Sequence, residues 1–140
     1  MTDTMTPGKT VLFVCRHGAA KSILAAADFR RLAMERGLEI RADSAGVEPD
    51  DRVLPIVAEV LGLGEPDVAH APRKVTPADL AAAWRVITFD LDPDELPASP
   101  AHLERWDDLP AVSESLPAAR DAIGRRLEGL IRGLAEPPAG

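Results

Sequence analysis

The spacing of apolar residues changes from one segment of the chain to the next, and these changes predict a series of strands and helices. Residues 10–14 form a short continuous apolar run, TVLFV, which is typical of a strand covered on both faces in a parallel sheet. From Ser22 the period becomes helical, and Gly37 is a suitable residue to end this helix. The apolar stripe of the predicted helix consists of Ala25, Phe29, Leu32 and Ala33.

Similar patterns continue to the end of the chain. Thr76 and Pro77 suit the cap and the first position of a short helix. Before this short helix, the patterns predict a strand at 38–46 and a helix from 52 that ends at Gly62 or Gly64. After it they predict a strand at 84–90 and a proline-rich loop at 92–101. A final helix carries one apolar stripe, which consists of Ile123, Leu127, Leu130, Ile131 and Leu134. Alternating strands and helices predict a three-layer α/β/α sandwich around a parallel sheet, which binds ligands beyond the carboxyl ends of its strands.

Length and organisation fit a single domain. The chain has 140 residues, and its sequence shows no internal repeat and no interdomain linker. We expect a disordered leader at 1–8, one domain at 9–136 and a flexible tail at 137–140.

Charge and cysteine content narrow the classes of function. The formal net charge of −7 argues against a general nucleic-acid or membrane surface. No apolar run approaches the roughly 20 residues of a membrane span. The single cysteine cannot form an internal disulfide, and the first residues lack the basic and apolar regions of a secretion signal. We therefore expect a cytoplasmic protein without a nucleic-acid or membrane partner.

The turn between the first strand and the first helix carries the candidate chemistry. Cys15 ends the strand, and Gly18, Ala19 and Ala20 leave little side-chain bulk over the backbone. The backbone N–H groups of this loop and the N-terminus of the helix together favour a bound anion.

The cysteine in this loop has two interpretations. The loop amides, the Ser22 hydroxyl and a nearby cation, Lys21 or Arg16, would favour its thiolate, which is the nucleophilic form. Alternatively, Cys15 is a small buried hydrophobe without chemistry. His17 is either a solvent-facing loop residue or a ligand contact or base, because imidazole changes its charge near neutral pH.

The loop and two further segments resemble a known family. VLFVC, followed by five residues, a cation and Ser22, is similar to the Cys-x5-Arg-Ser loop of the low-molecular-weight protein tyrosine phosphatases and the related arsenate reductases. The segments ADSAGVEP and HAPRKVTPADLAAAWRVITFD resemble the family's second strand and its following helix and third strand. The resemblance extends from Lys9 to about Leu134 and implies a four-stranded parallel sheet.

The resemblance also implies roles for the loop residues. In that family the cysteine attacks phosphorus, the loop amides and the arginine hold the equatorial oxygens, and the serine hydroxyl stabilises the thiolate. Carried over to this chain, Cys15 is the nucleophile, Ser22 is the thiolate stabiliser and Lys21 stands at the arginine position. Arsenate fits the same loop because it is a near-isostere of phosphate. The anion-binding loop then consists of Arg16, His17, Gly18, Ala19, Ala20 and Lys21.

Two loop positions depart from the family pattern. Lys21 keeps the positive charge but lacks the planar fork that grips two oxygens at once. By analogy with deleted oxyanion donors, this loss predicts a rate lower by about 10²–10³. Gly18 stands where the family usually has Asn, so the loop lacks side-chain hydrogen bonds at that position.

The family's general acid has no direct counterpart. Its Asp-Pro dipeptide lines up best with Ala111 and Val112. Asp108 is our candidate for the acid and Asp107 is an alternative, and proton transfer of this kind contributes about 10²–10⁴ to a rate. Asp92 belongs to the only Asp-Pro pair, which follows the third strand and comes too early in the chain.

Absent residue types narrow the substrate and the cofactor. The chain has no tyrosine, so an aromatic phosphoester would be recognised by Trp106 or Trp84. A single cysteine excludes an arsenate reductase that relays through an internal disulfide, but not one that uses a low-molecular-weight thiol. Arg73 and His70 are expected to organise the loop before the short helix. No ligand spacing or cysteine partner accompanies the histidines, so we expect no metal and no other cofactor; these histidines are His17, His70 and His102.

These features leave three functional hypotheses. The first is hydrolysis of phosphomonoesters, phosphotyrosine among them, with weak or specialised activity through Cys15. The second is a non-catalytic protein that binds phosphate-like anions or regulates through them. The third is an arsenate reductase coupled to a low-molecular-weight thiol. The expected partner is a phosphate-like or arsenate-like oxyanion, which a phosphorylated small molecule or protein carries in the first case.

Overall fold

The computed structural model describes residues 9–17, 20–49, 55–60, 73–112 and 114–135. The predicted leader, the predicted tail and the predicted end of the second helix at Gly62 or Gly64 lie outside these residues, as do Gly18, Ala19 and His70.

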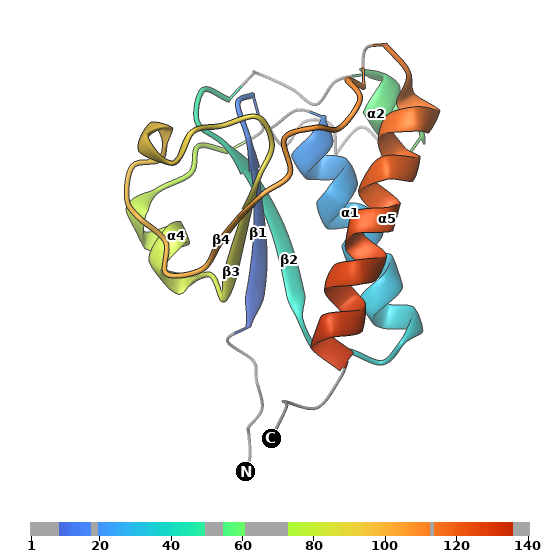
Figure 1. The fold of residues 1–140 in the computed structure, drawn as a ribbon, viewed down its shortest axis with the longest axis horizontal. Coiled ribbons are helices and arrows are strands. Elements are labelled where there is room, and N and C mark those ends of the chain that lie inside the picture. Colours follow the sequence, from blue (N-terminus) through green and yellow to red (C-terminus); the bar gives the residue numbers. More distant parts are fainter. Residues whose placement is uncertain (1–8, 18–19, 50–54, 61–72, 113, 136–140) are drawn as a thin grey trace.

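Strands and helices alternate along the described chain (Figure 1). They are β1 (Thr10–Cys15), α1 (Lys21–Glu35), β2 (Arg41–Gly46), α2 (Pro55–Val60), α4 (Pro77–Ala82), β3 (Arg85–Thr88), the 3-10 turn η1 (Pro93–Glu95), β4 (Leu103–Arg105) and α5 (Leu116–Ala135). In the described part of the chain, four strands form one sheet in the order β2-β1-β3-β4, and each neighbouring pair is parallel. The predicted four-stranded parallel sheet is confirmed.

Helices cover both faces of this sheet. α1 and α5 lie on one face and α4 lies on the other (Figure 1). Phe13 of β1 points into the layer of α1 and α5, where its ring centroid is 6.1 Å from those of Phe29 and Trp106. The next residue along, Val14, packs in the opposite layer with Leu80 of α4. This alternation buries both faces of β1 and confirms the predicted α/β/α sandwich.

Two predicted helix caps are present. Gly37 has a φ of 66°, and the N–H of Leu38 donates to the carbonyl of Ala33 at 2.8 Å, so the glycine ends α1 as predicted. At the start of α4, the Thr76 hydroxyl accepts the N–H of Asp79 at 3.1 Å.

Some element boundaries differ from the prediction. β2 begins at Arg41 rather than at residue 38, and α1 begins at Lys21 rather than at Ser22. β3 ends at Thr88 rather than at residue 90, because Asp90 has a φ of 56° that turns the chain. The three residues of β4 are too few to show a periodicity in the sequence.

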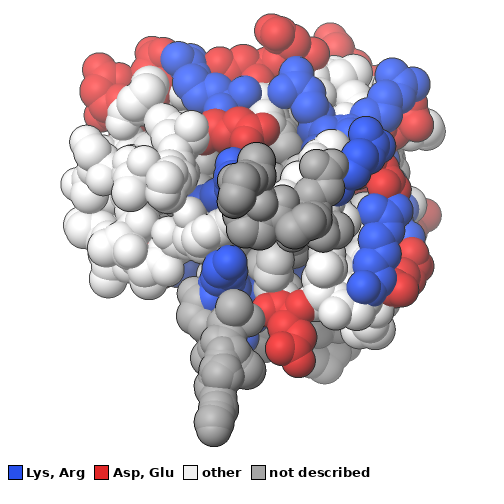
Figure 2. All heavy atoms as spheres, turned by 60° about the horizontal axis from the view of Figure 1, so that its bottom comes forward, with Lys and Arg blue, Asp and Glu red and all other residues white. Residues whose placement is uncertain are grey.

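The carboxyl ends of the strands meet at one edge, toward the top of Figure 1. Cys15 pairs with Gly46 of β2, and Val14 pairs with Thr88 of β3. The candidate loop therefore leaves the sheet at the edge where the fold predicts a ligand. Figure 2 brings the opposite end forward and shows Lys and Arg side chains beside Asp and Glu side chains. Among the described residues, no helix is long and apolar enough to cross a membrane.

Candidate active site

The structure brings Cys15 and Ser22 into contact. The Cys15 sulfur lies 3.1 Å from the Ser22 hydroxyl oxygen. Cys15 is 9% exposed and Ser22 is 0% exposed. When the sulfur is a thiolate, the hydroxyl is the donor of this hydrogen bond, which stabilises the negative charge. The pairing that the family resemblance implies is thus present in the geometry.

The N-terminus of α1 faces the same loop. Its N-cap residue is Ala20, whose methyl group cannot accept a hydrogen bond from the first helical N–H groups. The first turn contains no acidic residue. Among the described residues, no side chain caps these N–H donors, so they and the positive end of the helix dipole favour an anion at this end of α1. The predicted amide donors of Gly18 and Ala19 lie outside the described residues and stay a prediction.

Lys21 reaches across the mouth of the loop. Its ammonium donates to the Asp90 carboxylate at 2.9 Å and to the carbonyl oxygen of Leu109 at 3.3 Å. The Lys21 side chain is only 14% exposed. Within the described part of the chain, these two acceptors use two of its three N–H donors, which leaves one for a bound oxygen. Lys21 is thus a single-point contact where an arginine has a fork.

Asp90 is a site residue that the sequence reasoning missed. It lies two residues beyond the end of β3, is the one described non-glycine residue with a positive φ, and accepts a hydrogen bond from Lys21. Its backbone N–H donates to one oxygen of Asp107 at 3.0 Å. The other Asp107 oxygen lies 2.9 Å from the Arg105 guanidinium. The available signal was its position, an acidic residue at the carboxyl end of a central parallel strand.

Arg16 and His17 lie on the rim of the loop. The Arg16 guanidinium donates to Glu95 at 2.7 Å and to Glu48 at 3.3 Å. These carboxylates, Glu95 foremost, raise the pKa of Arg16. The backbone N–H of Asp92 and the Arg16 guanidinium in turn lower the pKa of Glu95. His17 is exposed, and its Nδ1 lies 3.2 Å from the backbone oxygen of Glu48.

The candidate acids differ in how they are held. Asp108 is exposed and makes no hydrogen bond or ion pair with the described residues, while the carbonyl of the next residue, Leu109, contacts Lys21. Asp107 has both oxygens engaged, one by the Asp90 N–H and the other by the Arg105 guanidinium. Val112, at the position that lines up with the family's proline, is buried in the core. Asp108 therefore stays our candidate for the acid.

The tryptophans do not lie where substrate recognition would need them, so that expectation is wrong. Trp106 is 0% exposed and packs within the aromatic core. Trp84 lies at the amino end of the sheet, where its backbone N–H donates to the carbonyl of Thr10. Its ring contacts the side chains of Lys9 and Arg85. A buried ring and a ring at the opposite edge cannot stack on a substrate bound beside Cys15.

Arg73 lies before α4, as expected of a residue that organises this loop. Its guanidinium contacts Asp79 at 2.7 Å and Asp43 at 2.9 Å, and so joins α4 to β2. Burial raises the pKa of Asp79, but hydrogen bonds from Arg73 and Thr76 lower it by more, so the pKa lies below its ordinary value. Within the described residues, no group of three or more His, Cys, Asp or Glu side chains could hold a metal ion.

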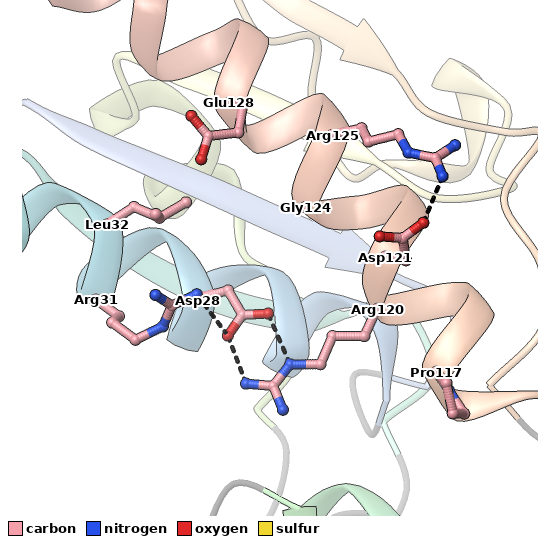
Figure 3. Close-up of a pocket in the computed structure, with 9 residues that line it drawn as sticks. All are labelled: Asp28, Arg31, Leu32, Pro117, Arg120, Asp121, Gly124, Arg125 and Glu128. Carbon is pink, nitrogen blue, oxygen red and sulfur yellow. Dashed lines mark hydrogen bonds and ion pairs between the residues drawn. The ribbon is translucent and has the colours of Figure 1, made fainter.

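A hollow of about 460 Å³ lies between α1 and α5, away from Cys15 (Figure 3). Its floor holds Asp28, which is 4% exposed and accepts hydrogen bonds from two nitrogens of Arg120 at 3.0 and 2.7 Å. This carboxylate raises the pKa of Arg120. None of the predicted site residues lines the hollow. The pair is a structural tie between the two helices.

Comparison with known protein families gives a match that includes the Cys15 loop and the strands beside it. A family model described as low molecular weight phosphotyrosine protein phosphatase matches residues 10–102. The chain belongs to this family. The match ends before Asp107 and Asp108, so the segment expected to supply the acid lies outside it. A search of curated proteins gives no match.

Solved structures with a similar fold include phosphatases and arsenate reductases. The thioredoxin-dependent arsenate reductase of Corynebacterium glutamicum shares 26% identity at a TM-score of 0.69; the match covers 89% of this chain and 61% of that protein, so this chain spans less than two thirds of its length. The arsenate reductase of Archaeoglobus fulgidus shares 26% identity at a TM-score of 0.67, covering 86% of this chain and 98% of the other. A low molecular weight protein tyrosine phosphatase from T. tengcongensis shares 19% identity, with a TM-score of 0.76 and coverages of 89% and 99%, and shows the shared fold alone.

Proposed function

We propose that the chain binds phosphate-like oxyanions at the Cys15 loop and hydrolyses phosphomonoesters through a cysteinyl-phosphate. The observation that carries this proposal is the 3.1 Å contact between the Cys15 sulfur and the buried Ser22 hydroxyl, at the open N-terminus of α1. A buried structural cysteine needs no such partner, whereas a thiolate nucleophile does. A reactive thiol of this kind suits a reducing cytoplasm.

The proposed reaction has two steps. The Cys15 thiolate attacks phosphorus, and an S–P bond forms as the P–O bond to the leaving group breaks. Asp108 gives a proton to the leaving oxygen, or a stable phenolate leaves as the anion. Water then attacks phosphorus, and an O–P bond forms as the S–P bond breaks. The water gives its proton to the Asp108 carboxylate, or to solvent where phenolate has left as the anion. Phosphate departs, and Ser22 donates its hydrogen bond to the restored thiolate.

The other loop residues hold the transferred group. The loop amides that the family resemblance implies would hold the oxygens, and the remaining N–H of the Lys21 ammonium would contact one of them. Because this ammonium is shared with Asp90 and Leu109, it stabilises the transition state less than an arginine fork would. The activity is therefore weak or restricted to substrates with a good leaving group.

Hydrolysis of p-nitrophenyl phosphate tests the proposal. We expect slow turnover by the purified chain and none by the Cys15→Ser variant. Inorganic phosphate should compete with the substrate. If the chain binds phosphate but neither it nor Lys21→Arg turns over the substrate, the protein is the non-catalytic anion binder instead.

Arsenate reduction is a second candidate, because the two similar structures with 26% identity are described as arsenate reductases. Cys15 would displace water from arsenate to form an S–As bond. A low-molecular-weight thiol would attack the Cys15 sulfur, forming a mixed disulfide as two electrons pass to arsenic and arsenite leaves; a second thiol would then release Cys15. Arsenate-dependent consumption of two thiols per turnover, lost in Cys15→Ser, supports this activity.

A further inference from the structure

We propose that Asp107 is a positioning residue for Lys21 and acts through Asp90. The inference rests on the proposed function, in which Lys21 contacts the bound oxyanion. Asp107 does not touch Lys21 directly. Its effect passes through the backbone of Asp90, whose N–H donates to Asp107, and then through the Asp90 carboxylate, which accepts from Lys21.

The first link is the backbone of Asp90. This residue has a φ of 56°, in the left-handed region that side-chain-bearing residues rarely adopt. β3 has ended at Thr88, so no strand partner continues the ladder to Asp90. The Asp107 carboxylate supplies the acceptor that its N–H needs, at 3.0 Å. Asp107 thereby holds a turn that the backbone alone would not favour.

Asp107 is held in place by contacts of its neighbour Trp106 and of its own side chain. The preceding residue, Trp106, is buried in the core, and its N–H donates to the carbonyl of Thr88 at 2.8 Å. The second Asp107 oxygen is paired with Arg105. The buried neighbour on one side and the guanidinium on the other hold the Asp107 carboxylate where it accepts the Asp90 N–H.

The second link is the hold on Lys21. A lysine side chain has four rotatable bonds, so an unheld ammonium spends little time at one point and binds an anion weakly. The turn at Asp90 places its carboxylate 2.9 Å from this ammonium. If the turn relaxes, the carboxylate moves and Lys21 loses its fixed position beside the loop. The Leu109 carbonyl alone is a weaker acceptor than a carboxylate.

Protection of Cys15 from iodoacetamide by inorganic phosphate measures this effect without relying on turnover. We expect Asp107→Ala to raise the phosphate concentration for half-protection about tenfold. Asp107→Asn keeps an oxygen that can accept the Asp90 N–H, so it should recover most of the protection. Asp94→Ala removes an exposed charge from η1 at the same end of the molecule and should match the unchanged protein.

A Lys21→Met background tests whether the effect of Asp107 depends on Lys21. If Asp107 acts through Lys21, adding Asp107→Ala to Lys21→Met causes no further loss of protection. An equal tenfold loss in both backgrounds overturns the proposal, as does protection of Asp107→Ala at the level of Asp94→Ala. If Asp107→Ala does not fold, Asp90→Asn takes its place, because asparagine tolerates the same φ but lacks the charge that holds Lys21. Absence of phosphate protection in the unchanged protein contradicts the proposed function instead.

Discussion

The Ser22 hydroxyl oxygen lies 3.1 Å from the Cys15 sulfur, although the two residues are seven positions apart. One residue ends β1 and the other lies in the first turn of α1, so the contact depends on how the start of α1 is placed against the end of the strand. The contact is the one that a thiolate nucleophile needs and that a space-filling cysteine does not, and the following experiments test this role and its surroundings.

Replacing Ser22 with alanine should slow the alkylation of Cys15 at neutral pH by about 10- to 100-fold, because the thiolate loses a hydrogen bond to a charged acceptor. The rate constant with iodoacetamide measures the change. Ser115→Ala, at the start of α5, provides a control with an equivalent loss of a hydroxyl. An unchanged rate in Ser22→Ala would mean that the hydroxyl does not stabilise the thiolate.

Exchanging Lys21 for arginine should raise kcat for an aryl phosphate by about tenfold, since a guanidinium can contact Asp90 and still offer a fork to the transition state. Lys21→Met should reduce the rate below that of the unchanged protein. Steady-state kinetics at fixed pH measures both. A Lys21→Arg variant that is equal to or slower than the unchanged protein contradicts the view that Lys21 limits catalysis.

Removing the buried Asp28 carboxylate should destabilise the protein more than removing an exposed carboxylate on the same helices. Asp28→Ala removes the bidentate partner of the partly exposed Arg120 guanidinium between α1 and α5, so we expect a loss of about 1–3 kcal/mol in the free energy of unfolding. Urea denaturation measures it. The exposed pair between Asp121 and Arg125 is the control, and Asp121→Ala should change stability by about 0.5 kcal/mol or less. Equal effects at the two sites would argue against a structural tie (Figure 3).

Acid should remove a stabilising contribution from Asp79. The pKa of this carboxyl is lower in the folded protein than its ordinary 3.8, because hydrogen bonds from Arg73 and Thr76 outweigh burial. Its contribution is therefore fully present above pH 3.8 and is lost as the pH falls through the folded value. Asp79→Asn should be less stable than the unchanged protein by about 1 kcal/mol at pH 7. The difference between their urea midpoints should shrink on acidification; a constant difference would leave the ion pair without a role.

Much of the fold was predictable because its signals are local. The apolar run of β1, the stripe of α1 and the caps at Gly37 and Thr76 each depend on neighbouring residues. β4 was not predictable from its own pattern, because three residues form a strand only when β3 lies beside them. The substrate role expected of Trp84 and Trp106 failed for the same kind of reason: a sequence does not state at which end of a sheet, or at what depth, a ring lies.

The sequence by itself determined the order of strands and helices and the placement of Cys15 and Ser22 at a strand end and a helix start. Periodicity, caps and small loop residues act over a few positions, so these features are encoded locally. Only the tertiary structure decided what Lys21 contacts, because Asp90 and Leu109 are 69 and 88 positions away. It also decided that Asp107 supports Asp90, since that contact requires β3 and β4 to pair in register. The candidate nucleophile is thus visible in the sequence, whereas the contacts of the neighbouring Lys21 ammonium depend on the packed sheet.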